Sequence, residues 1–295
     1  MLSQQSFRYI QYENKITDCS CITGMIDQYQ MRPISIPETI MHLWNSSTAN
    51  EVLCQHTKDA YYRNLLTGPP EISVIIPAYN EEKSIVKTLG SLCNNITTKP
   101  VEIIVVNNNS VDATAELATA CGVSCIQEGK QGITNARNGG LAAAKGKYIL
   151  NADADTLYPV NWIEAMTAPL YSNEDIALTY GIFSFLPTGN TGRLTYFFYE
   201  LVTDLVRAFK RRFREEAVNV YGFNSGFRRL QGLEVNGFDH PPGTNEDGWL
   251  AVKLRDKGLG KLCKVSKAPV WTTDRRLQID GGFWKALQKR IKRNL

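Results

Sequence analysis

The sequence predicts an α/β fold in which a mostly parallel central sheet is flanked by helices. Two observations predict this fold. Between residues 71 and 155, short apolar runs rich in Val and Ile alternate with segments of helical periodicity. Three of these runs end in a polar cluster, where ligands bind in open parallel sheets. The chain has 295 residues, 43% of them hydrophobic, so it can bury a sizeable core.

Three parts are expected along the chain. Residues 1–70 are weakly periodic and predict a short N-terminal extension, packed on or beside the main domain. The main domain takes residues 71–270, and residues 271–295 form a basic helical C-terminus. The N-terminus lacks the order of a signal peptide, and no run of about 18 apolar residues predicts a membrane span.

The elements of the main domain follow in order from Ile72. The run ISVIIPAYN is typical of a strand buried on both faces. EEKSIVKTLGSLCNN predicts a helix with Glu81 and Glu82 in its first turn, where the helix dipole favours acidic residues. We then expect a second strand in VEIIVVNNNS, a helix in DATAELATACG and a short third strand in VSCIQE. GITNARNGGLAAAKG predicts a loop and a helix, and KYILNADAD a fourth strand.

The second half is less regular and contains two basic clusters. TYFFYELVTDLVRAFKRRFREE predicts a helix, NVYGFNSGFRRLQGLEVNGFD is glycine-rich and strand-like, and NEDGWLAVKLRDKG predicts a helix that begins near Glu246. The basic clusters lie at residues 207–214 and 285–293. Four aromatic residues accompany them: Phe209, Phe213, Phe283 and Trp284. Such clusters indicate contact with an anionic membrane or a lipid-diphosphate acceptor, or else a solvated basic face.

Net charge and cysteine usage indicate which partners and which cellular location to expect. The net charge of +4, from 33 basic and 29 acidic residues, argues against a nucleic-acid partner. Seven cysteines occur without a CxxC pair, and the chain has only three histidines. This pattern favours reduced thiols over disulfides or structural zinc. We therefore expect a cytoplasmic protein, or one bound peripherally to the inner face of a membrane.

One pair of carboxylates follows the fourth predicted strand. Asp153 and Asp155 are separated by one residue, so on a strand both would lie on the same face, about 7 Å apart. Two such carboxylates can hold a hard divalent cation, and that cation can bridge to a diphosphate. The alternative is a solvated turn, because aspartates are common in turns.

Six motifs keep the order and spacing of one enzyme family. They are VIIPAYNEEKSIVKTLGSL, VEIIVVNNNSVDAT, GITNARNGGLAAAKGKYILNADADT, GFNSGFRR, VNGFD and NEDGWLAVKLRDKG. From Ile72 to Leu262 the chain resembles the family 2 glycosyltransferases, which are inverting enzymes that use nucleotide sugars and have the GT-A fold. The resemblance implies a GT-A domain with a nucleotide-binding half at residues 71–157 and an acceptor half at residues 158–270.

The resemblance also implies roles for particular residues. Asp247, the second of the acidic pair Glu246 and Asp247, would be the general base for the acceptor hydroxyl. Asp155, with Asp153 nearby, would hold Mn²⁺ or Mg²⁺. The residues implied at the nucleotide are Pro77, Ala78, Tyr79, Glu81, Asn108, Arg137 and Asp153. Those implied in a loop beside the donor sugar and acceptor are Gly222, Asn224, Ser225 and Gly226, and those implied at the diphosphate are Arg275 and Arg276.

Ordinary structural explanations stand beside these roles. Glu81, Glu246 and Asp247 also suit the first turn of a helix. Arg137 also suits a helix surface, and the glycine-rich segment around residue 222 suits a turn.

The implied reaction transfers a sugar from a nucleotide sugar to a hydroxyl of a glycan or a lipid-linked acceptor. Many family members carry an aspartate where this chain has Asn107, Asn108 and Asn109. Because asparagine both donates and accepts hydrogen bonds, the base stays open, with UDP favoured and GDP as the alternative.

The sequence has three other interpretations. One is an inactive nucleotide-sugar-binding relative, since the three asparagines depart from the commoner acidic pattern. Another is a sugar nucleotidyltransferase, although PAYNEE lacks the glycine-rich basic loop of that class. A Rossmann dehydrogenase is disfavoured because no G-x-G-x-x-G follows the first strand.

Overall fold

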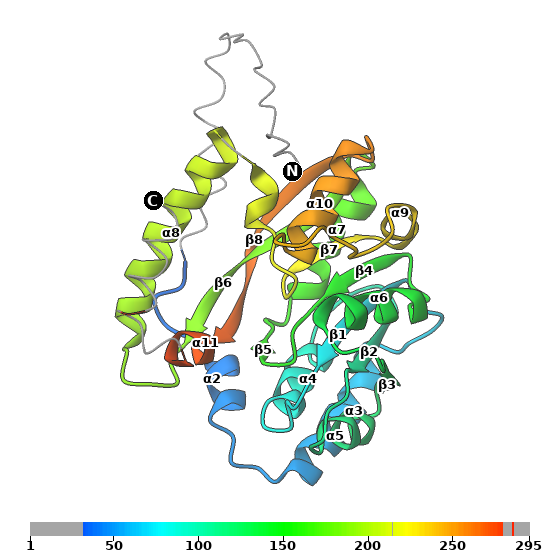
Figure 1. The fold of residues 1–295 in the computed structure, drawn as a ribbon. Coiled ribbons are helices and arrows are strands. Elements are labelled where there is room, and N and C mark those ends of the chain that lie inside the picture. The colour runs from blue at the N-terminus through cyan, green and yellow to red at the C-terminus, as the bar shows by residue number, and fades with distance from the viewer. Residues whose placement is uncertain (1–31, 214, 280–284, 286–295) are drawn as a thin grey trace, which may run out of the picture. The chain divides into compact units, whose positions relative to one another are not determined.

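A single sheet organises the described chain. The computed structural model describes residues 32–213, 215–279 and 285, and within them eight strands join in the order β3-β2-β1-β4-β7-β6-β8-β5 (Figure 1). The strands are β1 (Ile72–Ala78), β2 (Val101–Asn107), β3 (Ser124–Gln127), β4 (Tyr148–Asn151), β5 (Thr156–Leu157), β6 (Ile176–Leu186), β7 (Ser225–Arg228) and β8 (Lys261–Thr273). The predicted α/β fold with a central sheet is confirmed.

Parallel pairing builds the first half of the sheet. β1 pairs in parallel with β2 and β4, and β2 pairs in parallel with β3. The carboxyl ends of these four strands therefore share one edge, as the sequence predicts. β7 lies antiparallel between β4 and β6 and joins the two halves. β8 is parallel to β6, and the short β5 is antiparallel to β8.

Helices cover both faces of the sheet. One face packs against α3, α4, α5 and α7, and the other against α6 and α10. Along β1, Val74 and Ile76 belong to the first core and Ile75 to the second, which explains why this strand is apolar at nearly every position. The helices are α2 (Glu38–Trp44), α3 (Asn50–Asn64), α4 (Ile85–Cys93), α5 (Thr114–Ala120), α6 (Ile133–Ala143), α7 (Trp162–Ser172), α8 (Arg193–Phe213), the 3-10 helix η1 (Glu216–Asn219), α9 (Arg229–Glu234), α10 (Glu246–Asp256) and α11 (Arg275–Ile279).

The described part of the predicted N-terminal extension is built into this core. Tyr61 of α3 is buried, and its hydroxyl accepts a hydrogen bond from the Ile103 N–H of β2 at 3.2 Å. Leu65 is fully buried, and its carbonyl accepts from the Val101 N–H at 2.8 Å. The packing is continuous across residue 70, where the sequence predicts a boundary, and the described residues from 32 to 279 belong to one compact unit.

Two element boundaries differ from the predictions. The helix after β1 begins at Ile85 and has no acidic residue in its first turn, so the placement of Glu81 and Glu82 there is wrong. Both residues lie in the preceding turn. The fourth strand ends at Asn151, so Asp153 and Asp155 lie in the turn that follows it and not on the strand.

Candidate functional site

Two loops meet at the carboxyl edge of the parallel strands. The loop after β1 and the loop after β2 are joined by hydrogen bonds: the Asn80 N–H donates to Ser110 Oγ at 3.0 Å, and the Val111 N–H donates to Asn80 Oδ1 at 2.9 Å. Asn80 has φ of 54°, a conformation that asparagine tolerates better than most residues. These contacts bring the ends of β1 and β2 together, as the sequence predicts.

The residues expected at the nucleotide base differ in how far their side chains are exposed or already hydrogen-bonded. Pro77 and Ala78 close β1, and Tyr79 follows with 53% of its surface exposed. Asn108 is buried, and its side-chain amide donates to the carbonyls of Glu128 at 2.9 Å and Lys130 at 2.7 Å. Its Oδ1 accepts from the Gly132 N–H at 2.7 Å. Asn108 therefore fixes the loop that leads into α6, and Tyr79 is the side chain that is open to a ligand.

Arg275 crosses from the start of α11 to the two carboxylates nearest the strand ends. Its Nη1 donates to Glu81 Oε2 at 3.1 Å, and its Nη2 donates to Asp155 Oδ2 at 3.0 Å. These carboxylates favour the cationic form and raise the Arg275 pKa. The carboxylate of Asp274 accepts hydrogen bonds from the Tyr196 hydroxyl at 2.6 Å and from the Gln278 amide at 2.8 Å, which fixes the start of α11. Arg275, which the sequence predicts at the diphosphate, thus lies beside Asp155.

Arg137 connects two carboxylates from distant parts of the chain. Its buried guanidinium donates from Nη2 to Asp153 Oδ1 at 3.0 Å, and its Nε lies 3.5 Å from Asp247 Oδ1. The guanidinium also lies over the Phe238 ring, 5.8 Å from its centroid. The alternative of a helix-surface arginine is wrong because Arg137 is buried, and its charge is already balanced by carboxylates of the protein.

Asp247 is the buried carboxylate at the centre of the site. It lies in the first turn of α10, after Asn245, whose side chain accepts from the Gly248 N–H at 3.0 Å and caps the helix. Burial raises the Asp247 pKa to about 7; the nearby carboxylates of Glu246 and Asp153 add to the rise, and Arg137 opposes it. Among the described residues, no donor makes a hydrogen bond to Asp247 Oδ1.

Gly222 lets the backbone pass close to the side chains of Arg137 and Asp247. A Cβ on Gly222 would lie 2.3 Å from Asp247 Oδ1 and 2.4 Å from Arg137 Nη2, so a larger residue would displace one of them. The Gly222 N–H also hydrogen-bonds Asp247 and opposes the rise in its pKa. Gly222, Arg137, Asp153 and Asp247 therefore form one contiguous site.

Comparison with known proteins identifies the family. The sequence model described as Glycosyl transferase family 2 matches residues 73–230, more than half of the chain. The chain belongs to glycosyl transferase family 2. Glycosyltransferase GlyA of Streptococcus pneumoniae is 28% identical over 201 residues, which are 62% of this chain and 28% of GlyA. The uncharacterized glycosyltransferase YibD of Escherichia coli is 32% identical over 133 residues, which are 43% of this chain and 38% of YibD.

The fold of this family 2 chain is also found in solved structures. The mannosyltransferase PcManGT from Pyrobaculum calidifontis, in complex with GDP-Man and Mn²⁺, superposes with a TM-score of 0.52 at 18% identity, over 76% of this chain and 68% of that one. S. aureus TarS 1–349, in complex with UDP-GlcNAc, gives a TM-score of 0.54 at 18% identity, over 69% of this chain and 58% of that one. The predicted GT-A fold is confirmed. The family 2 chain spans less than two fifths of the length of the curated relatives named above.

The remaining residues predicted for the sugar pocket of this family 2 chain have buried, structural contacts. Asn224 accepts from Trp162 Nε1 at 2.8 Å and donates to the Ile182 carbonyl at 2.8 Å. Ser225 and Gly226 lie in β7, so the expectation of a loop is wrong for them. Gly222 is the member of the predicted set that contacts the site residues. The side chain of Arg276 lies outside the described residues.

Tyr158 belongs to the site of this family 2 chain although no sequence motif predicts it. Its fully buried hydroxyl accepts from the Asp153 N–H at 2.9 Å and donates to the Phe223 carbonyl at 3.0 Å. Burial raises its pKa well above the ordinary value, so the phenol stays protonated. Tyr158 thereby ties the turn of Asp153 to the chain beside Gly222. A buried tyrosine five residues after an aspartate has no sequence signature.

The turn after β4, which carries Asp153 and Asp155, fits a divalent cation. Asp153 and Asp155 present hard oxygen ligands, and both side chains are partly exposed. The cationic Arg275 already lies beside Asp155, which shows that this turn accommodates positive charge. Within the described residues, no group of three or more His, Cys, Asp or Glu side chains could hold a metal unaided. The remaining ligands would have to come from a bound diphosphate and water.

Proposed function

We propose that this chain is an inverting glycosyltransferase that transfers a sugar from a nucleoside-diphosphate sugar to a hydroxyl of a glycan or lipid-linked acceptor. A UDP-sugar is the favoured donor, and a GDP-sugar is the alternative. The observation that carries the proposal is Asp247, a buried carboxylate with a pKa of about 7 and one oxygen that receives no hydrogen bond from a described residue. The relatives named as glycosyltransferases support the reaction class.

Asp247 suits the role of general base. A base works best when its pKa lies near the working pH, because it is then ionised and still able to take a proton. Asp247 Oδ1 would take the proton of the acceptor hydroxyl as that oxygen attacks the anomeric carbon. The bond from that carbon to the diphosphate oxygen breaks on the opposite side, so the sugar is transferred with inversion. The negative charge leaves on the nucleoside diphosphate.

The donor would bind at the strand ends. Tyr79 is exposed beside the loop after β1, and Glu81 and Asp155 lie close together because both contact Arg275. Asp153 and Asp155 would hold Mn²⁺ or Mg²⁺, which when bound stabilises the charge that develops on the diphosphate. Arg275 carries a guanidinium that can bind phosphate oxygens in a bidentate manner, and Arg276 follows it in the sequence. We also propose a cytoplasmic location, on the strength of seven cysteines without a CxxC pair.

The first experiment separates donor binding from transfer. Calorimetric titration with UDP, GDP and their common sugar conjugates, each with and without Mn²⁺, would identify the donor class. Asp155→Ala should weaken binding in the presence of Mn²⁺ by tenfold or more, because it removes a ligand of the cation. Asp247→Asn should leave donor binding within a few-fold of wild type.

Transfer itself is then measured with the conjugate that binds. Asp247→Asn should reduce the transfer rate by about 100-fold or more, the usual contribution of a positioned base. The anomeric configuration of the product, read by NMR, should be opposite to that of the donor. Equal transfer rates in wild type and Asp247→Asn would rule out Asp247 as the base. A folded protein that binds none of these nucleotides would instead be an inactive relative.

A further inference from the structure

An apolar stripe runs along the outer face of α8. We define the α8 stripe as six residues with 38% to 67% of their surface exposed: Leu194, Phe198, Leu201, Val202, Leu205 and Val206. At 100° per residue these positions fall within one arc of the helix, and at 1.5 Å per residue they extend for about 18 Å. Six large apolar side chains in one exposed stripe mark an interaction surface.

The opposite face of α8 holds its acidic residues. Glu200 is buried and pairs with Arg193 at 2.9 Å and with Arg32 at 3.4 Å. Asp204 accepts from Arg32 Nη2 at 2.9 Å. Glu200 and Asp204 are the only acidic residues between positions 193 and 213, and both face the body of the protein. The exposed arc of α8 therefore carries no acidic side chain.

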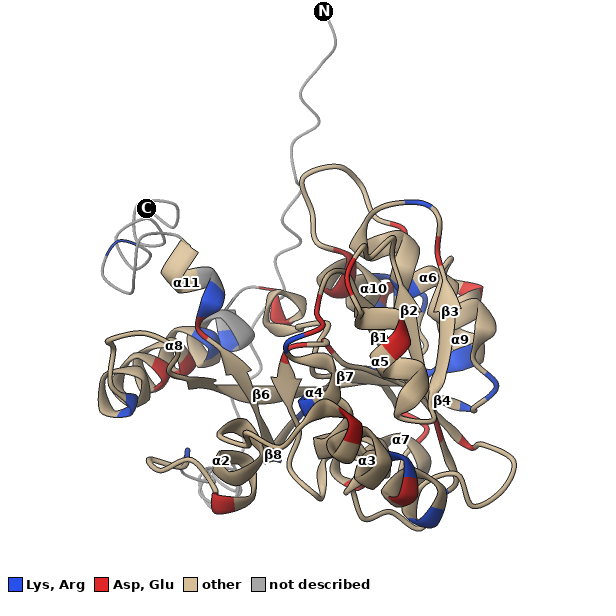
Figure 2. Ribbon diagram, turned by 90° about the horizontal axis from the view of Figure 1, so that it is seen from below, with Lys and Arg blue, Asp and Glu red and all other residues tan. Residues whose placement is uncertain are grey.

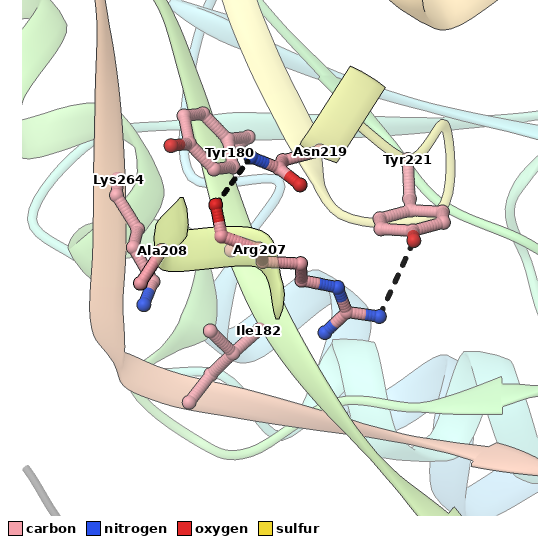
Figure 3. Close-up of a pocket in the computed structure, with 8 residues that line it drawn as sticks. Tyr180, Ile182, Arg207, Ala208, Asn219, Tyr221 and Lys264 are labelled. Atoms are coloured by element: carbon pink, nitrogen blue, oxygen red, sulfur yellow. Dashed lines mark hydrogen bonds between the residues drawn. The ribbon is translucent and has the colours of Figure 1, made fainter. Parts of the chain in front are cut away.

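The end of α8 is basic. Its last turn contains Lys210, Arg211 and Arg212, of which Arg212 is exposed. Arg207 does not add to this basic surface, because it lies between the rings of Phe183 and Tyr221, with 4.9 Å and 5.2 Å to their centroids. Arg207 lines a small cavity of about 20 Å³, and its Nη2 donates to the Tyr221 hydroxyl at 3.2 Å (Figure 3). This corrects the expectation that Arg207 belongs to a solvent-facing basic cluster.

We propose that the α8 stripe binds the surface of an anionic lipid membrane. The helix lies beyond β6 at one side of the described molecule in both ribbon views (Figures 1 and 2), and the six stripe residues are exposed. An apolar stripe that ends in Lys and Arg, with both acidic residues on the other face, is the pattern of a helix that lies in the membrane interface. No helix within the described ranges is long and apolar enough to cross a membrane.

A second copy of the chain fits the α8 stripe less well. Two helices paired through this face would bring the exposed Arg212 of each copy toward the contact, and the outer arc of α8 offers no acidic residue there, because Glu200 and Asp204 are paired on the inner face. An anionic phospholipid surface presents negative charge to this arc. This inference does not depend on the proposed transfer reaction, and vesicle binding tests it without any enzyme assay.

The test is vesicle flotation with the full chain. The vesicles are phosphatidylcholine alone, or phosphatidylcholine with about one third phosphatidylglycerol. Wild type should bind the anionic vesicles and not the neutral ones, and added salt should weaken the binding. The double variant Val202→Glu/Leu205→Glu should bind at least tenfold more weakly, because two of the apolar side chains that enter the interface are replaced by charges.

The matched control changes the net charge equally at other exposed apolar positions. Val52→Glu/Leu230→Glu, on α3 and α9, adds the same two charges away from the stripe and should bind within about twofold of wild type. If the stripe variant does not fold, as judged by circular dichroism, Leu194→Gln/Phe198→Gln takes its place with the same expected loss.

Three results would overturn the proposal. Wild type could fail to bind anionic vesicles, or both charge-matched variants could lose binding equally, which would indicate a net-charge effect. Sedimentation could instead show a wild-type dimer that the stripe variant turns into a monomer, with no vesicle binding, which would make a second copy the occupant of the stripe.

Discussion

At the scale of single residues, the site is a set of buried charges that restrain one another. Arg137 is fully enclosed, yet it contacts one carboxylate from the turn after β4 and another from the start of α10. The sequence predicted that Arg137, Asp153 and Asp247 belong to the site, because each falls in a family motif. It could not predict their mutual pairing, because contacts between residues 137, 153 and 247 depend on how the whole sheet assembles.

The first prediction concerns pH. Asp247 must be ionised to act as a base, and its pKa is raised to about 7. The transfer rate at saturating donor should therefore fall about tenfold for each pH unit below 7 and level off above it. The measurement is the pH profile of the transfer rate, with circular dichroism to show that the fold is retained. A rate that does not change between about pH 5 and pH 8 would contradict the assignment.

The second prediction concerns Arg137→Met. Removing the guanidinium leaves Asp247 and Asp153 facing each other without a cation, which should lower the free energy of unfolding by about 3–5 kcal/mol. Loss of Arg137 also raises the Asp247 pKa further. Because the Asp247 pKa is higher in the folded state than in the unfolded state, ionising Asp247 as pH rises destabilises the fold. This effect is stronger without Arg137, so Arg137→Met should lower the free energy of unfolding more at about pH 8 than at about pH 5.

Urea unfolding at both pH values checks the second prediction. Arg63→Met is the control, since Arg63 is exposed on α3. A penalty for Arg137→Met that is the same at both pH values, or no larger than that of the control, would show that the buried charges are not coupled.

At the scale of elements, the sequence predicted individual strands and helices but not the pairing of strands that lie far apart in the chain. The strands β1 and β2 could be located because burial on both faces leaves a continuous apolar run. The helix α10 could be located because the apolar residues of NEDGWLAVKLRDKG have helical spacing and follow the acidic pair Glu246 and Asp247. By contrast, β6 and β8 pair with each other although about 80 residues separate them, and no local pattern reveals such a partner. The turn of Asp155 was misplaced onto a strand because the motif says nothing about where β4 ends.

The third prediction concerns the contact between α11 and the strand-end loops. Arg275→Gln removes a cation from beside Asp155, and a metal ion would no longer compete with it for that carboxylate. Mn²⁺ should therefore bind the nucleotide-free protein a few-fold more tightly, as measured by electron paramagnetic resonance, since partly exposed pairs contribute modest energies. Nucleoside-diphosphate binding should weaken if Arg275 contacts the phosphates.

A charge-matched control accompanies Arg275→Gln. Lys267→Gln, at an exposed position of β8, removes the same single charge and should leave Mn²⁺ binding unchanged. Unchanged Mn²⁺ affinity in Arg275→Gln, or an equal gain in both variants, would mean that Arg275 does not compete for Asp155.

At the scale of the whole molecule, the described residues before residue 70, from 32 onward, are part of the main domain. The sequence predicted an extension packed on or beside the main domain, because α2 and α3 have weak periodicity and their role depends on contacts with residues far along the chain. In the structure α3 packs on α4 and α5, and the Tyr61 hydroxyl completes the hydrogen bonding of β2. Burial raises the Tyr61 pKa to about 12, so this hydroxyl stays protonated.

The fourth prediction tests that integration. Tyr61→Ala should lower the free energy of unfolding by about 3–5 kcal/mol, because it leaves a cavity in the main core. Tyr61→Phe should cost about 1–3 kcal/mol, because the buried Ile103 N–H loses its acceptor. Tyr62→Ala is the neighbouring control, since Tyr62 is 51% exposed. Urea unfolding measures all three, and similar values for Tyr61→Ala and Tyr62→Ala would show that α3 is a removable appendage.

The pairing of Arg137 with Asp153 and Asp247 also has an evolutionary consequence. A descendant that loses Arg137 would leave two carboxylates without their cation, and one that loses both carboxylates would leave a buried guanidinium unpaired; either cost is felt whether or not the reaction is still needed. The three positions should consequently be inherited as a unit. Lineages that abandon catalysis should replace all of them together with neutral residues, while lineages that change acceptor should alter the surrounding loops and retain all three.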